Sequence, residues 1–159
     1  MKPKKNLICG AGSIGIYVGA KLHSRKHNVI LFGRRKLRGI DGGVFINNKR
    51  FDVPKRFYKI PKNEKYDFVF ITTKLYDLDY MINLLKRNKI KGPIFIGIQN
   101  GIVEVSKYEK KLGRKIIPIT VFSGFNLDKN KLHVTPTAIG WKTELSRQGK
   151  EISALLLDA

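Results

Sequence analysis

Six residues near the N-terminus, Gly10-Ala11-Gly12-Ser13-Ile14-Gly15, constrain the fold of this chain more than any other segment. They follow directly on the apolar run Leu7-Ile8-Cys9, which is typical of a short buried strand. They open a stretch in which Ile14, Val18 and Leu22 are spaced for one face of a helix. The segment therefore predicts a strand, a glycine turn and a helix in immediate succession.

The rest of the chain continues this alternation. Apolar runs typical of buried strands cover residues 29–32, 66–72, 94–98 and 116–122, and helices are expected around 75–85 and 105–112. Residues 43–53 predict a hairpin turning at Asn47-Asn48, and residues 124–141 predict antiparallel strands joined near residues 128–130. Strands separated by helices predict an α/β fold of the Rossmann type: a doubly wound, mainly parallel sheet with a small antiparallel extension.

Length and composition bound the domain organisation. The 159 residues, 42% of them hydrophobic, suit one domain, which we expect over residues 1–145. Residues 146–159 begin an apolar helix that needs a surface to pack on, and we interpret it as the start of a missing C-terminal domain. No apolar run approaches the roughly 18 residues of a membrane span, and Cys9 alone leaves no internal disulfide. A cytoplasmic protein without membrane contact is expected.

The glycine pattern has the form G-x-G-x-x-G in the strand–turn–helix context that a dinucleotide requires. Gly10 allows the tight turn, Gly12 lets a diphosphate approach the backbone, and Gly15 lets the helix pack on the strand. The helix N-terminus adds free N–H groups and partial positive charge. A glycine-rich turn without a ligand is the alternative.

The residue that ends the second strand favours one cofactor. Arg34 follows Phe32-Gly33 and lies 19 residues after Gly15, and no carboxylate is near it in the sequence. An arginine here suits the 2′-phosphate of NADP, whereas a carboxylate would bind the 2′-hydroxyl of NAD. We therefore expect NADP(H) as the cofactor, with a solvated loop charge as the alternative for Arg34.

Several motifs together resemble the N-terminal domain of ketopantoate reductase (2-dehydropantoate 2-reductase). They are the glycine turn, Phe32-Gly33-Arg34, the segment from Asp67 to Lys74, and Gln99-Asn100-Gly101, and residues 131–140 also look like the strand pair that closes that domain. The match covers nearly the whole chain but about half of a full-length family member. The resemblance implies NADPH-dependent reduction of ketopantoate, a step of pantothenate synthesis, and a possible homo-oligomer.

The resemblance also implies roles for individual residues. Lys74 matches a family lysine that lies beside the cofactor near the reacting centre. Asn100 matches an asparagine that contacts both the nicotinamide and the substrate. Gly124 falls near a backbone contact to the cofactor. The cofactor-binding set is thus Gly10, Ala11, Gly12, Ser13, Ile14, Gly15, Arg34, Lys74, Asn100 and Gly124, with Lys74 and Asn100 also catalytic. The family's general acid lies in a helical C-terminal domain, which we expect to be missing from this chain, so slow or no turnover is expected.

The residues themselves leave alternatives open. Lys74 and Asn100 follow expected strand ends, where a cation and an amide can polarise a 2-oxo acid, but they are also compatible with a surface lysine and an ordinary turn. The substrate can therefore be another 2-oxo acid, or the chain a non-catalytic nucleotide-binding fragment.

A net charge of +20 also raises nucleic acid as a ligand. No nucleic-acid-binding motif is readable, so no such partner is expected. His23 and His27 lack a third ligand, so no metal site is expected either.

Overall fold

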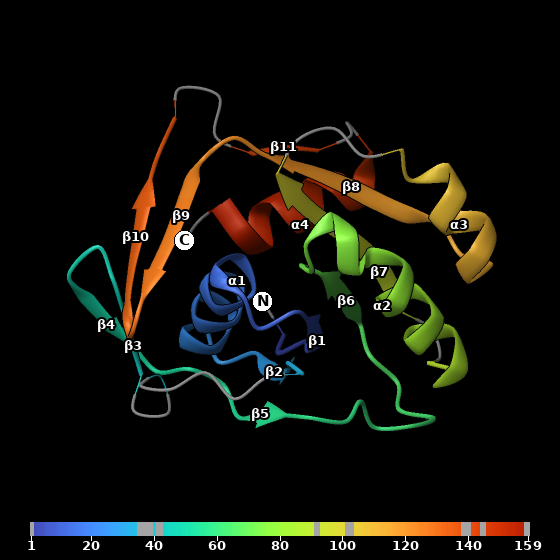
Figure 1. Ribbon diagram of the computed structural model, residues 1–159, viewed down its shortest axis with the longest axis horizontal. Helices are drawn as coiled ribbons and strands as arrows, with labels where there is room; N and C mark the ends of the chain where they lie inside the picture. The colour runs from blue at the N-terminus through green and yellow to red at the C-terminus, as the bar shows by residue number, and fades with distance from the viewer. Residues whose placement is uncertain are drawn as a thin grey trace.

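The computed structural model describes residues 2–34, 40, 43–90, 93–100, 104–137, 141–143 and 146–157. A seven-stranded sheet forms its centre, in the order β11-β8-β7-β6-β1-β2-β5 (Figure 1). All neighbouring strands are parallel except β11, which runs antiparallel to β8. The strands are β1 (Lys5–Cys9), β2 (Asn28–Phe32), β5 (Arg56–Phe57), β6 (Phe68–Ile71), β7 (Ile94–Asn100), β8 (Ile116–Val121) and β11 (Trp141–Thr143).

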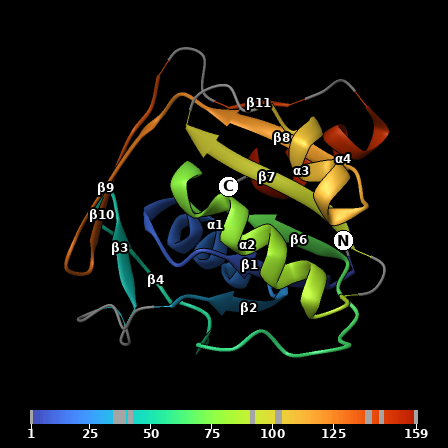
Figure 2. The same cartoon turned by 45° about the vertical axis from the view of Figure 1, so that its right-hand side comes forward.

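Helices cover both faces of this sheet (Figures 1 and 2). On one face lie α1 (Ser13–Ser24) and α4 (Arg147–Leu157), and on the other α2 (Leu75–Arg87) and α3 (Ser106–Leu112). The alternation of side chains along each strand explains the two layers, because Ile8 packs towards α1 while its neighbours Leu7 and Cys9 pack towards α2. The expected doubly wound α/β fold is confirmed.

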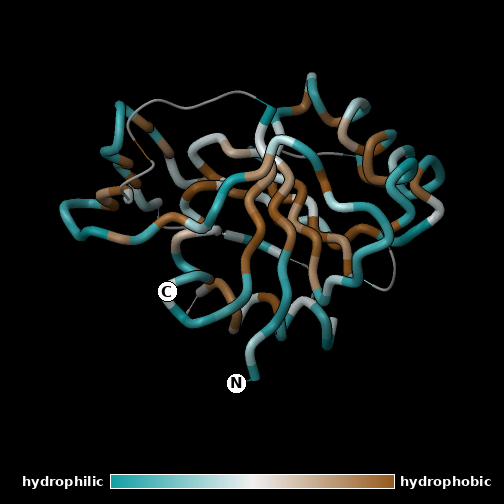
Figure 3. Tube along the Cα trace, turned by 90° about the horizontal axis from the view of Figure 1, so that it is seen from below, coloured by the Kyte–Doolittle hydropathy of each residue, from teal (hydrophilic) through white to brown (hydrophobic). Residues whose placement is uncertain are grey.

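The hydropathy of the chain follows this layering. In Figure 3 the central strands are the most continuously hydrophobic part of the trace, whereas the N-terminus and many of the connections are hydrophilic. The middle residues of β6 are fully buried, as expected for a strand covered on both faces.

A smaller sheet stands beside the main one and contains the expected antiparallel extension (Figure 1). Its four strands are ordered β4-β3-β10-β9, with β3 (Val44–Ile46), β4 (Lys49–Phe51), β9 (Gly124–Asp128) and β10 (Lys131–Thr135). The turn between β3 and β4 has positive φ at Asn47 (45°) and Asn48 (71°), which confirms the predicted hairpin.

The sequence did not predict that the two hairpins pair with each other. β3 runs parallel to β10, and the Asn47 side chain joins them, donating to Val134 O (3.0 Å) and accepting from Val134 N (2.9 Å). Asn47 and Val134 are 87 residues apart in the sequence, so no local sequence pattern could predict this contact.

The last helix packs on this domain itself. Ile152, Leu155 and Leu156 of α4 are buried in the same core as α1, and Arg25 donates to Leu155 O (2.7 Å) near the end of the helix. The surface on which the apolar residues of this helix were expected to pack is therefore the α1 side of the sheet. No helix among the described residues is long and apolar enough to cross a membrane.

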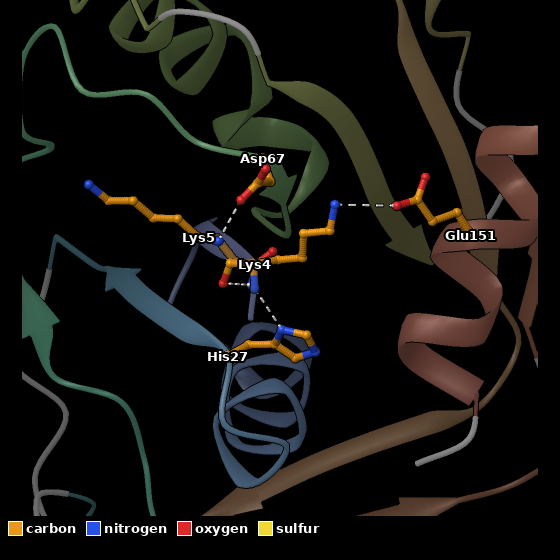
Figure 4. A network of polar contacts seen from close by, with 6 residues as sticks. Lys4, Lys5, His27, Asp67 and Glu151 are labelled. Atoms are coloured by element: carbon orange, nitrogen blue, oxygen red, sulfur yellow. Dashed lines mark hydrogen bonds and ion pairs between the residues drawn. The ribbon is translucent and has the colours of Figure 1, made fainter. Parts of the chain in front are cut away.

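Polar contacts tie the amino end of β1 to its neighbours (Figure 4). Lys4 N donates to His27 Nδ1 (3.0 Å), Lys5 N donates to Asp67 Oδ2 (2.7 Å), and the Lys4 ammonium lies 3.7 Å from Glu151 of α4. Because α1 ends at Ser24, His27 lies beyond the helix and does not share a helix face with His23.

The His27 contact makes folding stability pH-dependent. Burial, followed by the nearby positive charge of Arg25, lowers the pKa of His27 below its ordinary value of 6.5. The unfolded chain therefore takes up a proton at a higher pH than the folded chain, so this stability is present above pH 6.5 and is lost as the pH falls.

We expect His27→Asn to remove that dependence, because an amide oxygen can accept the Lys4 N–H at any pH. Between about pH 7.5 and about pH 5.5 the unmutated protein should lose more unfolding free energy than the variant, because only the imidazole takes up a proton more readily in the unfolded chain. Urea unfolding of both proteins at the two pH values measures this. Equal losses would contradict the assignment.

Candidate functional site

The candidate site lies where the sheet changes direction of winding. From β1 the chain crosses to β2, and from β6 it crosses to β7 on the other side, while β1 and β6 are themselves neighbours. Loops at the carboxyl ends of two such strands separate and leave a crevice, which is where open α/β sheets bind ligands. Here these loops are the glycine turn after Cys9 and residues 72–74 after Ile71.

The glycine turn is held by the neighbouring loop. Thr72 Oγ1 donates to Gly10 O (2.8 Å), and Thr72 N donates to Cys9 O (2.9 Å). Gly10 has φ of 126°, which L side chains rarely adopt. The tight turn expected at Gly10 is thus present, and Thr72, to which the sequence assigned no role, secures it.

The other two glycines of the motif differ sharply in their surroundings. A Cβ on Gly15 would lie 1.7 Å from Gly10 O, so the backbone of α1 approaches the turn too closely for any side chain. A Cβ on Gly12 would meet no described atom within 4 Å. The fold itself therefore requires glycine at position 15 but leaves open space at position 12.

Two cavities flank Gly12 and share the loop after β6. The first, of about 440 Å³, extends towards the end of β7 and is lined by Gly12, Ser13, Ile14, Thr72, Thr73, Lys74, Leu75, Tyr76, Ile98, Gln99, Asn100 and Phe125. The second, of about 380 Å³, extends towards the end of β2 and is lined by Gly10, Ala11, Gly12, Phe32, Gly33, Arg34, Thr72, Thr73, Lys74, Tyr76, Asp77 and Met81. Together they form one crevice across the carboxyl ends of β2, β1, β6 and β7.

The two residues predicted to be catalytic both line the first cavity. Lys74 precedes α2 as its N-cap residue, and Asn100 ends β7; both are exposed. The neighbouring strands β6 and β7 are parallel, which brings their carboxyl ends to one edge. The structure thus places a cation and an amide beside Gly12, as the sequence predicted. Gly101 lies outside the described residues.

Gln99 is a site residue that the sequence did not assign. Its buried side chain donates to Ile71 O (2.8 Å), so it links the ends of β6 and β7 directly under the first cavity. Gly97 leaves room for it, because a Cβ there would lie 3.1 Å from Gln99 Oε1. β7 is buried continuously from Phe95 to Gln99, so the sequence pattern did not single out this polar side chain.

The crevice has an unsatisfied polar atom and an open backbone. Thr73 lines both cavities, and its Oγ1 is buried and has no hydrogen-bond partner among the described residues. Buried hydroxyls are normally paired, so this hydroxyl is free to bind a polar group. With the open space at Gly12 and the N-terminus of α1, which begins at Ser13, the crevice suits a dinucleotide diphosphate.

Arg34 lines the second cavity, at the end of β2 where it was expected. Its guanidinium pairs with Asp77 and lies 4.8 Å from the centroid of the Tyr80 ring, both of which belong to α2. No carboxylate lies near Arg34 in the sequence, but the fold places the carboxylate of Asp77 beside it. The neighbouring basic residues Arg35, Lys36 and Arg38 lie outside the described residues.

The expected contact at Gly124 is not apparent from the cavities. Gly124 begins β9 and is exposed, whereas the next residue, Phe125, lines the first cavity. Phe125 packs against Tyr17 (5.2 Å between ring centroids) and Trp141 (6.0 Å). These three rings connect the small sheet, α1 and β11, and they fix the wall of the cavity.

Comparison with known proteins gives a consistent result. The model of the family described as ketopantoate reductase PanE/ApbA matches residues 6–144. The chain belongs to the ketopantoate reductase family. A curated 2-dehydropantoate 2-reductase of Archaeoglobus fulgidus is 26% identical over 142 residues, which are 89% of this chain and 47% of that protein. The chain thus spans about half the length of this curated relative.

Solved structures show the same fold. A PanE/ApbA family ketopantoate reductase from Ralstonia eutropha aligns with a TM-score of 0.79 and 21% identity over 96% of this chain and 53% of that chain. D-mandelate dehydrogenase, solved with NADH and anilino(oxo)acetate, aligns with a TM-score of 0.73 and 19% identity over 97% of this chain and 54% of that chain. These two alignments show the fold that the chain shares with both enzymes, and the family assignment rests on the match over residues 6–144.

Proposed function

We propose that this chain is the NADP(H)-binding half of a 2-dehydropantoate 2-reductase-like enzyme that reduces ketopantoate or a related 2-oxo acid in the cytoplasm. The observation that carries the proposal is the crevice at Gly12, which two basic residues line: Arg34 lines the second cavity and Lys74 lines both. The diphosphate would lie on the backbone of residues 10–15, including Ala11, Ser13 and Ile14, with Gly10 and Gly15 shaping the turn.

Arg34 provides the recognition of the 2′-phosphate in this proposal. Its planar fork can bind a phosphate at two points, and Tyr80 holds the guanidinium plane at the wall of the cavity. This end of the crevice would take the adenosine half, so the nicotinamide half would lie in the first cavity, near Lys74 and Asn100.

Lys74 and Asn100 would bind the 2-oxo acid beside the nicotinamide. A lysine ammonium balances the charge of the acid's carboxylate, and an amide N–H donates to the carbonyl oxygen and stabilises negative charge that develops there. The bound cofactor supplies the hydride. Gly124 would contribute backbone contacts at the β9 side of the cavity.

We expect Arg34→Ala to remove most of the preference for the phosphorylated cofactor. The lost charge-assisted hydrogen bonds are worth about 1–3 kcal/mol of NADPH binding, whereas NADH binding should change little. Parallel fluorescence titrations of both proteins with NADPH and NADH measure this. Arg114→Ala is a matched control, because it removes the same charge from an exposed residue that precedes the amino end of β8, whereas the crevice lies at the carboxyl ends of the strands. An unchanged NADPH affinity in Arg34→Ala would contradict the role of Arg34.

We further propose that the chain alone turns over ketopantoate very slowly or not at all. Residues 146–159 would lead into a C-terminal domain that supplies the general acid and most substrate contacts, and the relatives that match this chain are about twice as long. Steady-state NADPH oxidation with ketopantoate tests this: binding without turnover is expected, and a turnover of about 1 s⁻¹ or faster, ordinary for an enzyme, would refute it.

Self-association is a further expectation. A ketopantoate reductase of Staphylococcus aureus is described as dimeric, and its chain aligns with this one at a TM-score of 0.70. We expect no nucleic-acid partner.

A further inference from the structure

The pairing of Arg34 with Asp77 places both possible recognition groups for the adenosine ribose in one cavity. The guanidinium of Arg34 and a carboxylate oxygen of Asp77 form an ion pair, and both residues line the cavity beside the glycine turn. Their side chains are 43% and 26% exposed, so the pair is accessible to a ligand but partly shielded from water. They are 43 residues apart in the sequence, and only the fold brings them together.

α2 holds the guanidinium on two sides. Asp77 lies in the first turn of α2, where its N–H donates to Lys74 O (2.9 Å), and Tyr80 follows one turn later with its ring 4.8 Å from the Arg34 guanidinium carbon. Arg34 is therefore already oriented, and one of its faces is covered, before a ligand arrives. The carboxylate occupies part of the donor fork that a phosphate would use.

We propose that Asp77 is a specificity-determining residue that weakens the preference of this site for NADPH over NADH. The proposal rests on the cofactor site proposed above. A 2′-phosphate would have to share Arg34 with a carboxylate of the same charge sign, which opposes its binding. An unphosphorylated ribose would instead offer its 2′-hydroxyl to the Asp77 carboxylate, as acidic residues do in NAD-binding sites.

The test is the cofactor preference of Asp77→Asn. Asparagine keeps the size of the side chain but removes its charge, so NADPH should bind about tenfold tighter, while NADH should bind equally or more weakly. The same shift should appear with the adenosine halves alone, when 2′,5′-ADP is compared with 5′-AMP. It should shrink as the salt concentration rises, because an exposed like-charge repulsion is screened.

Asp79→Asn provides the matched control. It makes the same chemical change two residues further along α2, but Asp79 pairs with Lys107 and Lys111 and does not line either cavity among the described residues. The control variant should show the unmutated ratio of the NADPH and NADH affinities. Adding Arg34→Ala to Asp77→Asn should remove the part of the gain that comes from competition for the guanidinium, whereas the direct repulsion between Asp77 and the phosphate does not need Arg34.

The outcomes separate this inference from the proposed function. If NADPH binds but Asp77→Asn changes the NADPH-to-NADH ratio no more than Asp79→Asn does, Asp77 has no role in specificity and the proposed function stands. If neither cofactor binds to the unmutated chain or to Asp77→Asn, when circular dichroism shows both to be folded, the proposed function fails as well.

Discussion

Replacing Gly15 by alanine is expected to lower the free energy of unfolding by more than about 3 kcal/mol. The added methyl group would lie 1.7 Å from the carbonyl oxygen of Gly10, and that oxygen is itself fixed by a hydrogen bond from Thr72 Oγ1. Neither group is the end of a flexible side chain, so α1 must shift away from the turn. Shifting α1 disturbs its packing on the face of the sheet formed by Ile8 and Leu31.

Urea unfolding of Gly15→Ala measures this loss. Gly19→Ala is a useful comparison, because the atoms nearest to a Cβ at this position of the same helix belong to the side chains of Pro54 (3.2 Å) and Ile8 (3.3 Å) and not to the backbone. We expect a much smaller loss there. A Gly15→Ala protein as stable as Gly19→Ala would mean that the turn does not have the geometry described.

Replacing Gly12 by alanine should have the opposite signature: a nearly unchanged fold and a large loss of cofactor affinity. Gly12 has φ of −81°, which suits alanine, and its Cβ would point into open space, so the cost in stability should stay below about 1 kcal/mol for the changed N-cap. The same methyl group would stand where a diphosphate approaches the backbone, and we expect NADPH and NADH to bind at least about tenfold more weakly.

Calorimetric or fluorescence titration of Gly12→Ala with both cofactors measures this effect. The loss should be equal for NADPH and NADH, because both carry the same diphosphate, and this distinguishes it from the NADPH-selective loss in Arg34→Ala. Unchanged affinity for both cofactors would show that the diphosphate does not lie at Gly12.

Local patterns in the sequence were sufficient to predict most helices and strands of the fold. The glycine turn, the turn at Asn47-Asn48 and the end of the helix expected around residues 105–112 were all predicted, and Gly10, Asn47, Asn48 and Gly113 at these places have a positive φ. Such features depend on a few neighbouring residues, so the sequence reports them directly.

Contacts between distant segments were not predictable in this way. The pairing of β3 with β10, the short strand β5 at the sheet edge, and the burial of the apolar face of α4 against the α1 side all depend on the assembled sheet. The apolar residues of α4 indicated a helix correctly, but they could not indicate which surface covers it.

In the candidate site, too, the sequence predicted what depends on local patterns and missed what depends on contacts between distant segments. Lys74 and Asn100 were predicted to lie together because parallel neighbouring strands end at one edge, and both line the first cavity. Asp77 and Gln99 were missed because their importance lies in partners 43 and 28 residues away. The role of each predicted residue in binding and catalysis stays a prediction.

Backbone amide shifts during an NADPH titration test the central claim most directly. The account predicts that the largest shifts occur in residues 10–15 and 72–74, followed by Arg34 and Asn100, and that they saturate at one cofactor per chain. Largest shifts instead on the basic small sheet, around Lys49 and Lys131, with strong dependence on salt, would show that the cofactor binds as a general polyanion and would contradict the assignment of this crevice.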